Sequence, residues 1–235
     1  MNNVAKTGEQ PDINRNLVNR LVKYLRVLRK LKTLGFVKVF SNNLADSVGV
    51  TAAVVRKDFS MVGVTGNKRG GYDIDALTDD VSKVLGAQGE KSVVLVGCGR
   101  IGSALMNYQE FAKESIHILA GFDAHPERVP SGPIPIHPMS ELEAFVAHNK
   151  VDVGIIAVPE SAATQVFDDM VKAGIRGFLN FTSVELKCHG RCDRPNCEHS
   201  CIISNVNIGL ELENLFHLVT METRPKASRS RRNDA

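Results

Sequence analysis

The sequence predicts an α/β protein of two domains, a small helical domain followed by a doubly wound parallel β-sheet domain. Three observations predict this arrangement. In the first 86 residues apolar side chains recur mainly at helical spacing, whereas beyond residue 91 short continuous apolar runs alternate with amphipathic stretches. The 235 residues are enough for two small domains. The charge also divides, because residues 1–86 carry 14 Lys/Arg and 8 Asp/Glu, whereas residues 87–235 carry 15 and 18.

The uneven charge limits the classes of partner that the chain can have. A net charge of +6 on residues 1–86 and of −3 on the remainder fits a polyanion that binds the first domain alone. A basic surface that is only solvated would carry the same charge. No apolar run approaches the roughly 18 residues of a membrane span, and the polar N-terminus is not a secretory signal. We therefore expect a cytoplasmic protein without a membrane partner.

The first domain, expected over residues 14–86, contains the pattern of a helix–turn–helix. An amphipathic helix is predicted over residues 14–34. A short helix capped by Ser41 and a second helix capped by Thr51 follow, with a turn between them. Small or apolar residues stand where such a pair packs on a third helix, at Leu44, Ala45, Val48, Val50 and Val55. This layout is typical of DNA-binding helix–turn–helix domains, although an ordinary helical hairpin has a similar pattern.

The segment after the second helix predicts a β-hairpin, the wing of a winged helix–turn–helix. Two β-like runs in residues 62–74 flank a turn, GNKRGG, that carries Lys68 and Arg69. Charges at such a tip reach DNA phosphates or the minor groove. A mobile surface hairpin is the simpler alternative. A short helix over residues 75–86 then leads to a polar joint between the domains.

The second domain, expected over residues 91–204, begins with the signature of a dinucleotide-binding Rossmann domain. A buried apolar strand over residues 92–97 leads into a G-x-G-x-x-G motif, and a helix over residues 103–112 follows. The motif consists of Gly97, Cys98, Gly99, Arg100, Ile101 and Gly102. Its first glycine allows a tight turn, the second lets the backbone approach a pyrophosphate, and the third allows close packing of helix on strand. The helix N-terminus then faces the phosphates.

Two further positions complete the predicted nucleotide site. The strand over residues 115–122 ends at Asp123, 21 residues beyond Gly102, where an acidic residue accepts hydrogen bonds from the adenosine ribose. No arginine stands beside Asp123 to bind a 2′-phosphate, so NAD(H) is favoured over NADP(H). Pro159 ends the buried strand over residues 151–158 and is expected to line the nicotinamide side, although a proline can also simply stop a strand. A helix over 139–150 precedes this strand, and a strand over 175–181 follows it.

Four cysteines lie within fourteen residues of the second domain, in the loop 188–201. They are Cys188, Cys192, Cys197 and Cys201, in the spacing C-x₃-C-x₄-C-x₃-C. Four neighbouring thiolates repel one another unless a cation holds them or they oxidise. We therefore expect one metal centre, with zinc favoured and an iron–sulfur cluster as the alternative. Disulfide switching without metal, or an unrelated role, stays open. A final helix is expected over residues 205–222.

The whole pattern resembles the redox-sensing transcriptional repressor Rex family. The matching stretches run from about residue 18 to 184 and include RLVKYLRVLRKL, SNNLADSVGVTAAVVRKDFSMVG, GGYDI, VGCGRIGSAL, GFDAHP, AVPE and NFTSVEL. Rex-type proteins are homodimers that repress respiratory and fermentative genes. They bind palindromic operators when NADH is low and release them when NADH binds. The resemblance implies this function here, with NAD(H) as the cofactor and double-stranded operator DNA as the partner.

The resemblance also implies roles for particular residues. The major groove of DNA would be contacted from the second short helix, by Thr51, Val54, Arg56 and Lys57. The wing would contribute Lys68, Arg69 and Tyr72. The cofactor site would be lined by Gly97, Gly99, Gly102, Asp123 and Pro159, together with the rest of the glycine-rich motif.

The C-terminal helix of Rex-type proteins is exchanged between subunits and carries a switching aspartate. That aspartate alternates between a tyrosine of the nucleotide-binding domain and an arginine of the DNA-binding domain. The matching residues here are Tyr108 and Arg20, but the position of the aspartate holds Asn207. An uncharged amide cannot make the same charge-assisted bond. The cysteine loop is a second departure from the family pattern.

Two other classes of function have to be weighed against a regulator. An NAD-dependent oxidoreductase needs catalytic groups beside the nicotinamide, but the sequence has no Tyr-x-x-x-Lys pair and no evident substrate domain. The isolated histidines His117, His125 and His137 fit surface or capping positions better than a catalytic base. We therefore expect no enzymatic activity. The other class is a metal- or cluster-dependent regulator with a vestigial nucleotide site.

Overall fold

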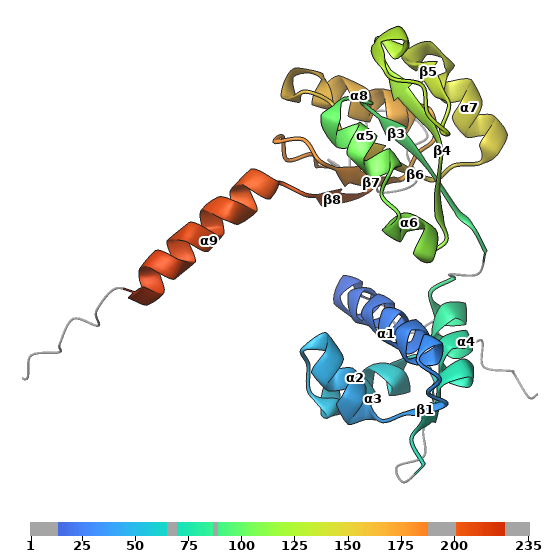
Figure 1. Cartoon of the computed structure of the whole chain (residues 1–235), viewed down its shortest axis with the longest axis vertical. Coiled ribbons are helices and arrows are strands. Elements are labelled where there is room, and N and C mark those ends of the chain that lie inside the picture. Colours follow the sequence, from blue (N-terminus) through green and yellow to red (C-terminus); the bar gives the residue numbers. More distant parts are fainter. Residues whose placement is uncertain (1–13, 65–69, 87–88, 188–200, 224–235) are drawn as a thin grey trace, which may run out of the picture. The chain divides into compact units, whose positions relative to one another are not determined.

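The computed structural model describes residues 14–64, 70–86, 89–187 and 201–223 (Figure 1). The chain divides into two compact units, Met1–Gly89 and Glu90–Ala235. Helices dominate the first unit and a six-stranded parallel sheet dominates the second. The predicted fold class, a winged helix–turn–helix domain followed by a Rossmann domain, is therefore confirmed.

The first unit is a cluster of helices around one apolar core. Its described elements are α1 (Arg15–Thr33), β1 (Lys38–Val39), α2 (Ser41–Val48), α3 (Ala52–Met61), β2 (Tyr72–Asp73) and α4 (Ile74–Val84). Helix α1 begins where the side chain of Asn14 accepts a 3.0 Å hydrogen bond from the amide of Leu17. Its buried face carries Leu17, Leu21, Tyr24, Leu25 and Leu28. Side chains of α2, α3 and α4 pack against this face and close the core.

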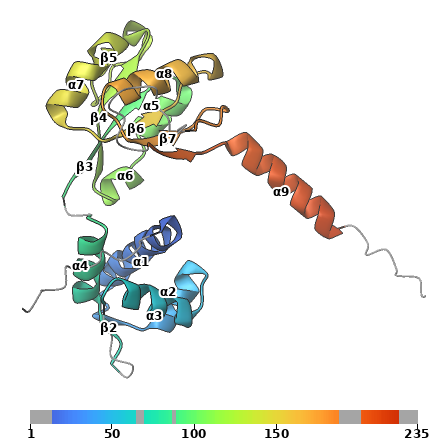
Figure 2. The same cartoon turned by 180° about the vertical axis from the view of Figure 1, so that it is seen from behind.

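Two details of the first unit differ from the prediction. Ser41 is the first residue of α2 and does not cap it, because Phe40 holds the extended backbone of the cap position. The predicted first strand of the wing is also wrong, since the amides of Val62 and Val64 bond to carbonyls of α3 and terminate that helix. Strand β2 (labelled in Figure 2) instead pairs antiparallel with β1, Val39 lying opposite Tyr72. Residues 65–69, the expected hairpin turn, lie outside the described residues.

The second unit is a parallel sheet with helices on both faces. Its strands are β3 (Lys91–Val96), β4 (Ile116–Asp123), β5 (Ile136–Pro138), β6 (Val153–Ile156), β7 (Gly177–Asn180) and β8 (Ile202–Asn205), in the order β5-β4-β3-β6-β7-β8. Its helices are α5 (Arg100–Met106), α6 (Glu110–Lys113), α7 (Leu142–Asn149), α8 (Glu160–Lys172) and α9 (Ile208–Thr223). The chain places β4 and β5 on one side of β3 and β6 to β8 on the other. This reversal between β3 and β6 is the switch point where such sheets bind ligands.

The central strand β3 shows why both faces are covered. Val93 and Leu95 point to a core that includes side chains of α5 and α6. Val94 and Val96 point to the opposite core, which includes side chains of α7 and α8. All four are buried because successive side chains of a strand alternate between its faces. The continuous apolar run in the sequence therefore reflects a strand covered on both faces.

Three predictions for the second unit need correction. The helix expected over residues 103–112 is two helices, because α5 ends where the side-chain amide of Asn107 donates to the carbonyl of Ser103. The helix expected from residue 139 begins as a single 3₁₀ turn, and α7 starts at Leu142. Strands β5 and β8 were not predicted. Both are short strands at the two edges of the sheet.

The last described helix, α9, carries apolar side chains that its own unit leaves exposed. They include Ile208, Leu210, Leu212, Leu215, Phe216, Leu218 and Met221. Within the residues that the structure describes, neither α9 nor any other helix is long and apolar enough to cross a membrane.

Candidate functional site

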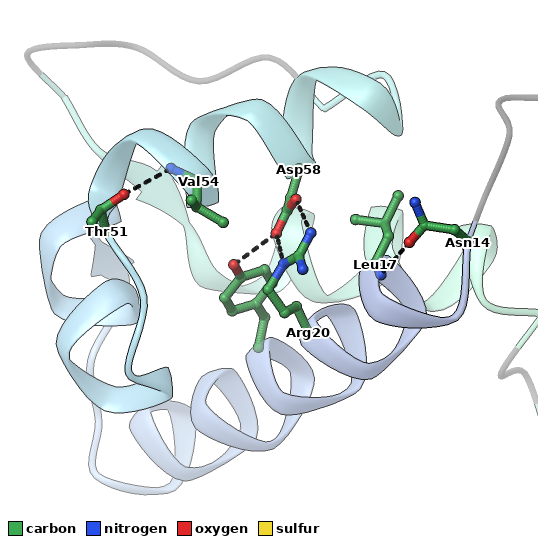
Figure 3. Close-up of polar contacts among 7 residues, drawn as sticks. Asn14, Leu17, Arg20, Thr51, Val54 and Asp58 are labelled. Carbon is green, nitrogen blue, oxygen red and sulfur yellow. Dashed lines mark hydrogen bonds and ion pairs between the residues drawn. The ribbon is translucent and has the colours of Figure 1, made fainter.

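Helices α2 and α3 form the predicted helix–turn–helix. Between them Gly49 adopts φ +75°, the left-handed conformation that glycine accepts without steric cost. Thr51 caps α3, as predicted, and its hydroxyl accepts a hydrogen bond from the amide of Val54 at 3.3 Å (Figure 3). The turn and the cap together set the direction in which α3 leaves α2.

The exposed side of α3 carries the residues that the sequence nominated for DNA contacts. Arg56 and Lys57 are exposed, Val54 is partly buried, and Thr51 is exposed at the helix start. The guanidinium of Arg56 donates to the hydroxyl of Ser41 at 3.1 Å, which joins the two helices of the motif on their outer side. The structure thus presents two cationic side chains from one helix, as a phosphate- and base-contacting helix requires.

Of the three residues predicted to serve the wing, the structure describes only Tyr72. Lys68 and Arg69 lie outside the described residues. Tyr72 lies in β2, and its ring packs edge-on against the ring of Phe59, with the centroids 5.1 Å apart. Tyr72 therefore packs against the core of the domain.

A buried polar cluster joins α1 to α3 (Figure 3). Asp58 is 1% exposed, and its two carboxylate oxygens accept hydrogen bonds from Nε and Nη2 of Arg20 at 2.6 and 2.7 Å. The hydroxyl of Tyr24 donates to the same carboxylate at 2.9 Å. The hydrogen bond to Asp58 raises the pKa of Arg20. The pKa of Tyr24 is raised mainly by burial and also by its hydrogen bond to Asp58.

The sequence indicated no role for Asp58, and it placed Tyr24 only among the apolar positions of the first helix. A signal was present, because Val55, Asp58 and Phe59 have the i, i+3, i+4 spacing of one buried helix face. A carboxylate on such a face needs a buried partner. Its partner stands 38 residues earlier in the chain, beyond what local spacing can reveal.

The glycine-rich loop has the geometry that its motif predicts. Gly97 follows β3 with φ +94°, and a Cβ there would lie 2.5 Å from the carbonyl oxygen of Ala157. A Cβ on Gly102 would collide with the carbonyl oxygen of Gly97, so this glycine permits the close packing of α5 on the loop. A Cβ on Gly99 would meet no atom of the chain within 4 Å. The open space at Gly99 fits a pyrophosphate that approaches the backbone from outside.

Asp123 joins the loop from the end of the neighbouring strand. One carboxylate oxygen accepts the amide of Cys98 at 2.8 Å, and the other accepts the amide of His125 at 2.9 Å. Each carboxylate oxygen has a second acceptor position. Asp123 can therefore hold the loop in place and still accept hydrogen bonds from ribose hydroxyls.

The other residues nominated around the loop differ in exposure. Cys98 is buried, and burial together with the charge of Asp123 raises the pKa of its thiol to about 11. Arg100 and Ile101 are exposed at the start of α5. Tyr108 is 52% exposed after α5, and its ring packs edge-on against that of Phe111. The thiol of Cys98 is thus a packed, protonated group within the loop.

Pro159 lies across the switch point from the glycine-rich loop. It follows β6 and occupies the cap position of α8, directly before Glu160. The carboxylate of Glu160 accepts a hydrogen bond from the hydroxyl of Ser183 at 2.8 Å. The loop after β6 is thereby tied to the loop after β7, and both follow the carboxyl ends of their strands.

Two amide side chains connect this region to the C-terminal helix. Asn180 is fully buried, and its amide group donates to the carbonyl of Val184 at 2.7 Å and to the side-chain oxygen of Asn205 at 2.8 Å. The side chain of Asn205 in turn bonds to both the amide and the carbonyl of Leu186. Asn207 follows and caps α9, its side-chain oxygen accepting the amide of Leu210 at 3.0 Å.

The predicted metal ligands are mostly outside the structure. Cys188, Cys192 and Cys197 lie outside the described residues, and Cys201 packs partly buried against the core beside β8. Among the described side chains, no group of three or more His, Cys, Asp and Glu is arranged to hold a metal ion. The metal centre stays a prediction.

Family models match both parts of the chain. Residues 12–60 match a family described as "Putative DNA-binding protein N-terminus", and residues 88–184 match one described as "CoA binding domain". The first match covers the helix–turn–helix with α1, and the second covers the glycine-rich loop, Asp123 and Pro159.

Relatives of known type match almost the whole chain. The redox-sensing transcriptional repressor Rex of Exiguobacterium sp. is 34% identical over 212 residues, covering 89% of this chain and 93% of the relative. The Rex protein of Leuconostoc citreum is 33% identical over 213 residues, covering 90% and 94%. That of Streptomyces avermitilis is 37% identical over 203 residues, covering 85% and 77%.

Solved structures give the same assignment. The crystal structure of RSP in complex with β-NAD⁺ and operator DNA matches with a TM-score of 0.73 and 28% identity, covering 93% of this chain and all of that one. The structure of RSP, a Rex-family repressor, in complex with β-NADH matches with a TM-score of 0.70 and 27% identity, covering 90% and 96%. The chain therefore belongs to the Rex family of redox-sensing transcriptional repressors.

Proposed function

We propose that this protein represses transcription by binding operator DNA through its helix–turn–helix, and that NADH bound at the glycine-rich loop releases the operator. One observation carries the proposal. A helix–turn–helix with an exposed cationic helix and a Rossmann loop with its acidic partner Asp123 occur in one chain of this family. Solved relatives have been crystallised with NADH and with NAD⁺ plus operator DNA. The protein thus reports the balance of NADH and NAD⁺.

The nucleotide site needs few residues to hold NAD(H). The open backbone at Gly99 and the start of α5 at Arg100 would receive the pyrophosphate, with Ile101 beside it. Asp123 would accept the ribose hydroxyls. Pro159, across the switch point, and Tyr108, after α5, would border the nicotinamide half. When bound, the nicotinamide supplies only its redox state as a signal.

The DNA-binding surface follows from the exposed side of α3. Arg56 and Lys57 would reach base edges and phosphates in the major groove, with Thr51 and Val54 at the helix start. Lys68, Arg69 and Tyr72 would serve the wing. A palindromic operator is expected because a twofold-symmetric dimer presents two such helices.

We further propose that α9 forms the homodimer interface by packing on a second copy of the chain. A large set of exposed apolar side chains on one helix marks an interaction surface. Size-exclusion chromatography with light scattering tests this assignment. A chain ending before α9 should lose the dimer, and a dimer of unchanged stability would contradict it.

The loop 188–201 remains a candidate metal centre on the strength of its spacing. We propose that Cys188, Cys192, Cys197 and Cys201 bind one metal, with zinc favoured over an iron–sulfur cluster. Elemental analysis and a visible spectrum of anaerobically purified protein distinguish the two. Less than about half an equivalent of metal, with four freely titrating thiols, would contradict the site.

The test of the main proposal is an operator titration with each nucleotide. The operator is first obtained by selection from randomised duplexes with the protein itself. Saturating NADH should weaken operator binding by about 5- to 150-fold, the usual range of coupling between two sites, and NAD⁺ should weaken it far less. An operator affinity that NADH leaves unchanged would refute the proposal.

A further inference from the structure

Helix α3 is held in its domain by few side chains. Its buried residues are Val55, Asp58 and Phe59. Phe59 packs edge-on between the rings of Tyr24 and Tyr72, with centroids 5.3 and 5.1 Å away. Contacts of this kind depend less strictly on distance and angle than hydrogen bonds do, so they define the orientation of a helix less sharply. The remaining buried residue is a carboxylate, whose contacts are directional.

Among the residues that the structure describes, the carboxylate of Asp58 accepts hydrogen bonds from two side chains of α1. Arg20 donates two parallel hydrogen bonds, at 2.6 and 2.7 Å, and Tyr24 donates a third at 2.9 Å. Arg20 and Tyr24 are one helical turn apart, so the three bonds approach the carboxylate from two levels of α1. Two parallel bonds fix the plane of the carboxylate, and the third fixes its height along α1. Together they constrain the rotation of α3 about its own axis, in addition to the bond from Arg56 to Ser41 of α2.

Stability alone is a weak explanation for this cluster. Asp58 is buried, although the side chain of Arg20 is 28% exposed. A carboxylate that leaves water loses hydration that its Coulomb attraction only roughly restores, and apolar side chains of similar size often stabilise a fold as well. Buried polar groups can instead select one arrangement among several compact ones. In this domain the bonds of Asp58 to α1 would select one orientation of α3 relative to α1.

The orientation of α3 decides where its cationic residues reach. Arg56 and Lys57 directly precede Asp58 and lie on the exposed side of the same helix turn. Hydrogen bonds to base edges require heavy-atom distances of about 2.7–3.2 Å. A small rotation of α3 moves the tip of a long side chain by more than this tolerance, whereas contacts to phosphates adapt more easily.

We propose that Arg20, Tyr24 and Asp58 are positioning residues for DNA recognition, which fix the orientation of α3 and thereby the operator preference of Arg56 and Lys57. The proposal rests on the proposed function of the protein. It assigns the cluster a role in specificity, because the cluster acts on the orientation of the helix that carries Arg56 and Lys57. It also gives Arg20 a carboxylate partner within its own domain.

The test compares the affinity for the selected operator with the affinity for a scrambled duplex at the same salt concentration. The full-length variants are Tyr24→Phe, which removes one hydrogen bond and keeps the ring, and Arg20→Lys, which keeps the charge and loses the parallel pair. Lys23→Arg makes the reverse exchange at the neighbouring exposed position and serves as the matched control. A lower folded fraction reduces both affinities equally, so a purely structural role leaves their ratio unchanged.

The ratio of operator affinity to scrambled-duplex affinity should fall by about 5- to 150-fold in Arg20→Lys, because that is the effect of losing one base contact. In Tyr24→Phe the same ratio should fall by a smaller factor of about 3 or more. Lys23→Arg should keep the ratio, and both Lys23→Arg and Tyr24→Phe should keep the NADH affinity of the unmodified protein. An unchanged ratio in Arg20→Lys overturns the proposal. If that variant does not fold, Tyr24→Phe decides in the same way.

A third variant separates orientation from stability directly. The triple substitution Arg20→Met, Tyr24→Phe and Asp58→Leu replaces the cluster with apolar side chains. It should fold, bind scrambled DNA as before and lose the operator preference, whereas a retained preference overturns the proposal. If the unmodified protein selects no sequence from the random duplexes, the proposed function itself fails, and the present proposal fails with it.

Discussion

At the scale of single residues, Asp123 combines an observed role in the fold with the role in ribose binding that we propose for it. Its carboxylate accepts the amides of Cys98 and His125, so it fixes the glycine-rich loop against the end of β4. The ribose hydroxyls need the same negative charge. The distance of 21 residues from Gly102 predicted this residue, because the strand–loop–helix–strand unit has a nearly constant length.

The substitution Asp123→Asn should weaken NADH binding. One hydrogen bond to a charged acceptor contributes about 1.5–3 kcal/mol, so the dissociation constant should rise by about tenfold or more. Isothermal titration calorimetry measures the change. Glu127→Gln, the same exchange at an exposed carboxylate nearby, should leave the affinity unchanged. Equal effects of the two substitutions would contradict the assignment.

Two glycines of the loop should separate binding from stability. Gly99→Ala places a methyl group in space that the chain leaves empty, so the fold should keep its stability and NADH should bind more weakly. Gly102→Ala drives a methyl group into the carbonyl of Gly97, which should lower the free energy of unfolding by about 1–3 kcal/mol. Thermal unfolding and NADH titration of both variants test this. Tight NADH binding by Gly99→Ala would show that the pyrophosphate lies elsewhere.

The Cys98 thiol should resist alkylation at neutral pH. Its pKa of about 11 lies above the ordinary value of 9.0, so the folded protein retains the proton more tightly than the unfolded chain. The resulting stabilisation is complete below about pH 9 and is lost as the pH rises towards 11. Peptide mapping after iodoacetamide treatment at pH 8 should find Cys98 unmodified in the native state and modified after unfolding. Rapid native labelling would place the thiol outside the core.

At the scale of elements, the sequence predicts those helices, turns and strands that nearby residues determine, and it misses those that depend on pairing over long separations. The cap at Thr51, the turn at Gly49 and the central strand β3 are determined by nearby residues, and the sequence predicted all three. Strands β1 and β2 have two residues each and pair residues that lie 33 and 35 positions apart, which no local pattern encodes. Edge strand β8 has no fully buried residue to mark it.

Helix α9 provides a prediction at this scale. Asn207 caps it through a hydrogen bond to the amide of Leu210, so Asn207→Ala should destabilise the first turn by about 1 kcal/mol. Asn207→Asp should retain the cap, because aspartate accepts the same bond and interacts favourably with the helix N-terminus. Hydrogen exchange at the Leu210 amide measures the effect. Equal protection in Asn207→Ala would argue against the cap.

At the scale of the whole molecule, the sequence predicted DNA binding and NAD(H) binding more readily than it predicted the long-range side-chain pairs that hold each domain together. The basic first domain, the glycine-rich motif and Asp123 are local signals, and they indicated DNA and NAD(H). The Arg20–Asp58 pair joins residues 38 positions apart, and the amide pair Asn180–Asn205 joins residues 25 apart. Only the folded chain brings such pairs together.

We propose above all that operator DNA and NADH each weaken the binding of the other, because they favour different conformations of the same protein. Coupling between two ligands is reciprocal, so the factor by which NADH weakens operator binding must equal the factor by which operator weakens NADH binding. Calorimetric titration of NADH into the free protein and into the operator complex, beside operator titrations with and without NADH, measures both factors. We expect two equal factors of about 5- to 150-fold. NADH binding of equal affinity to the free protein and to the operator complex would contradict it.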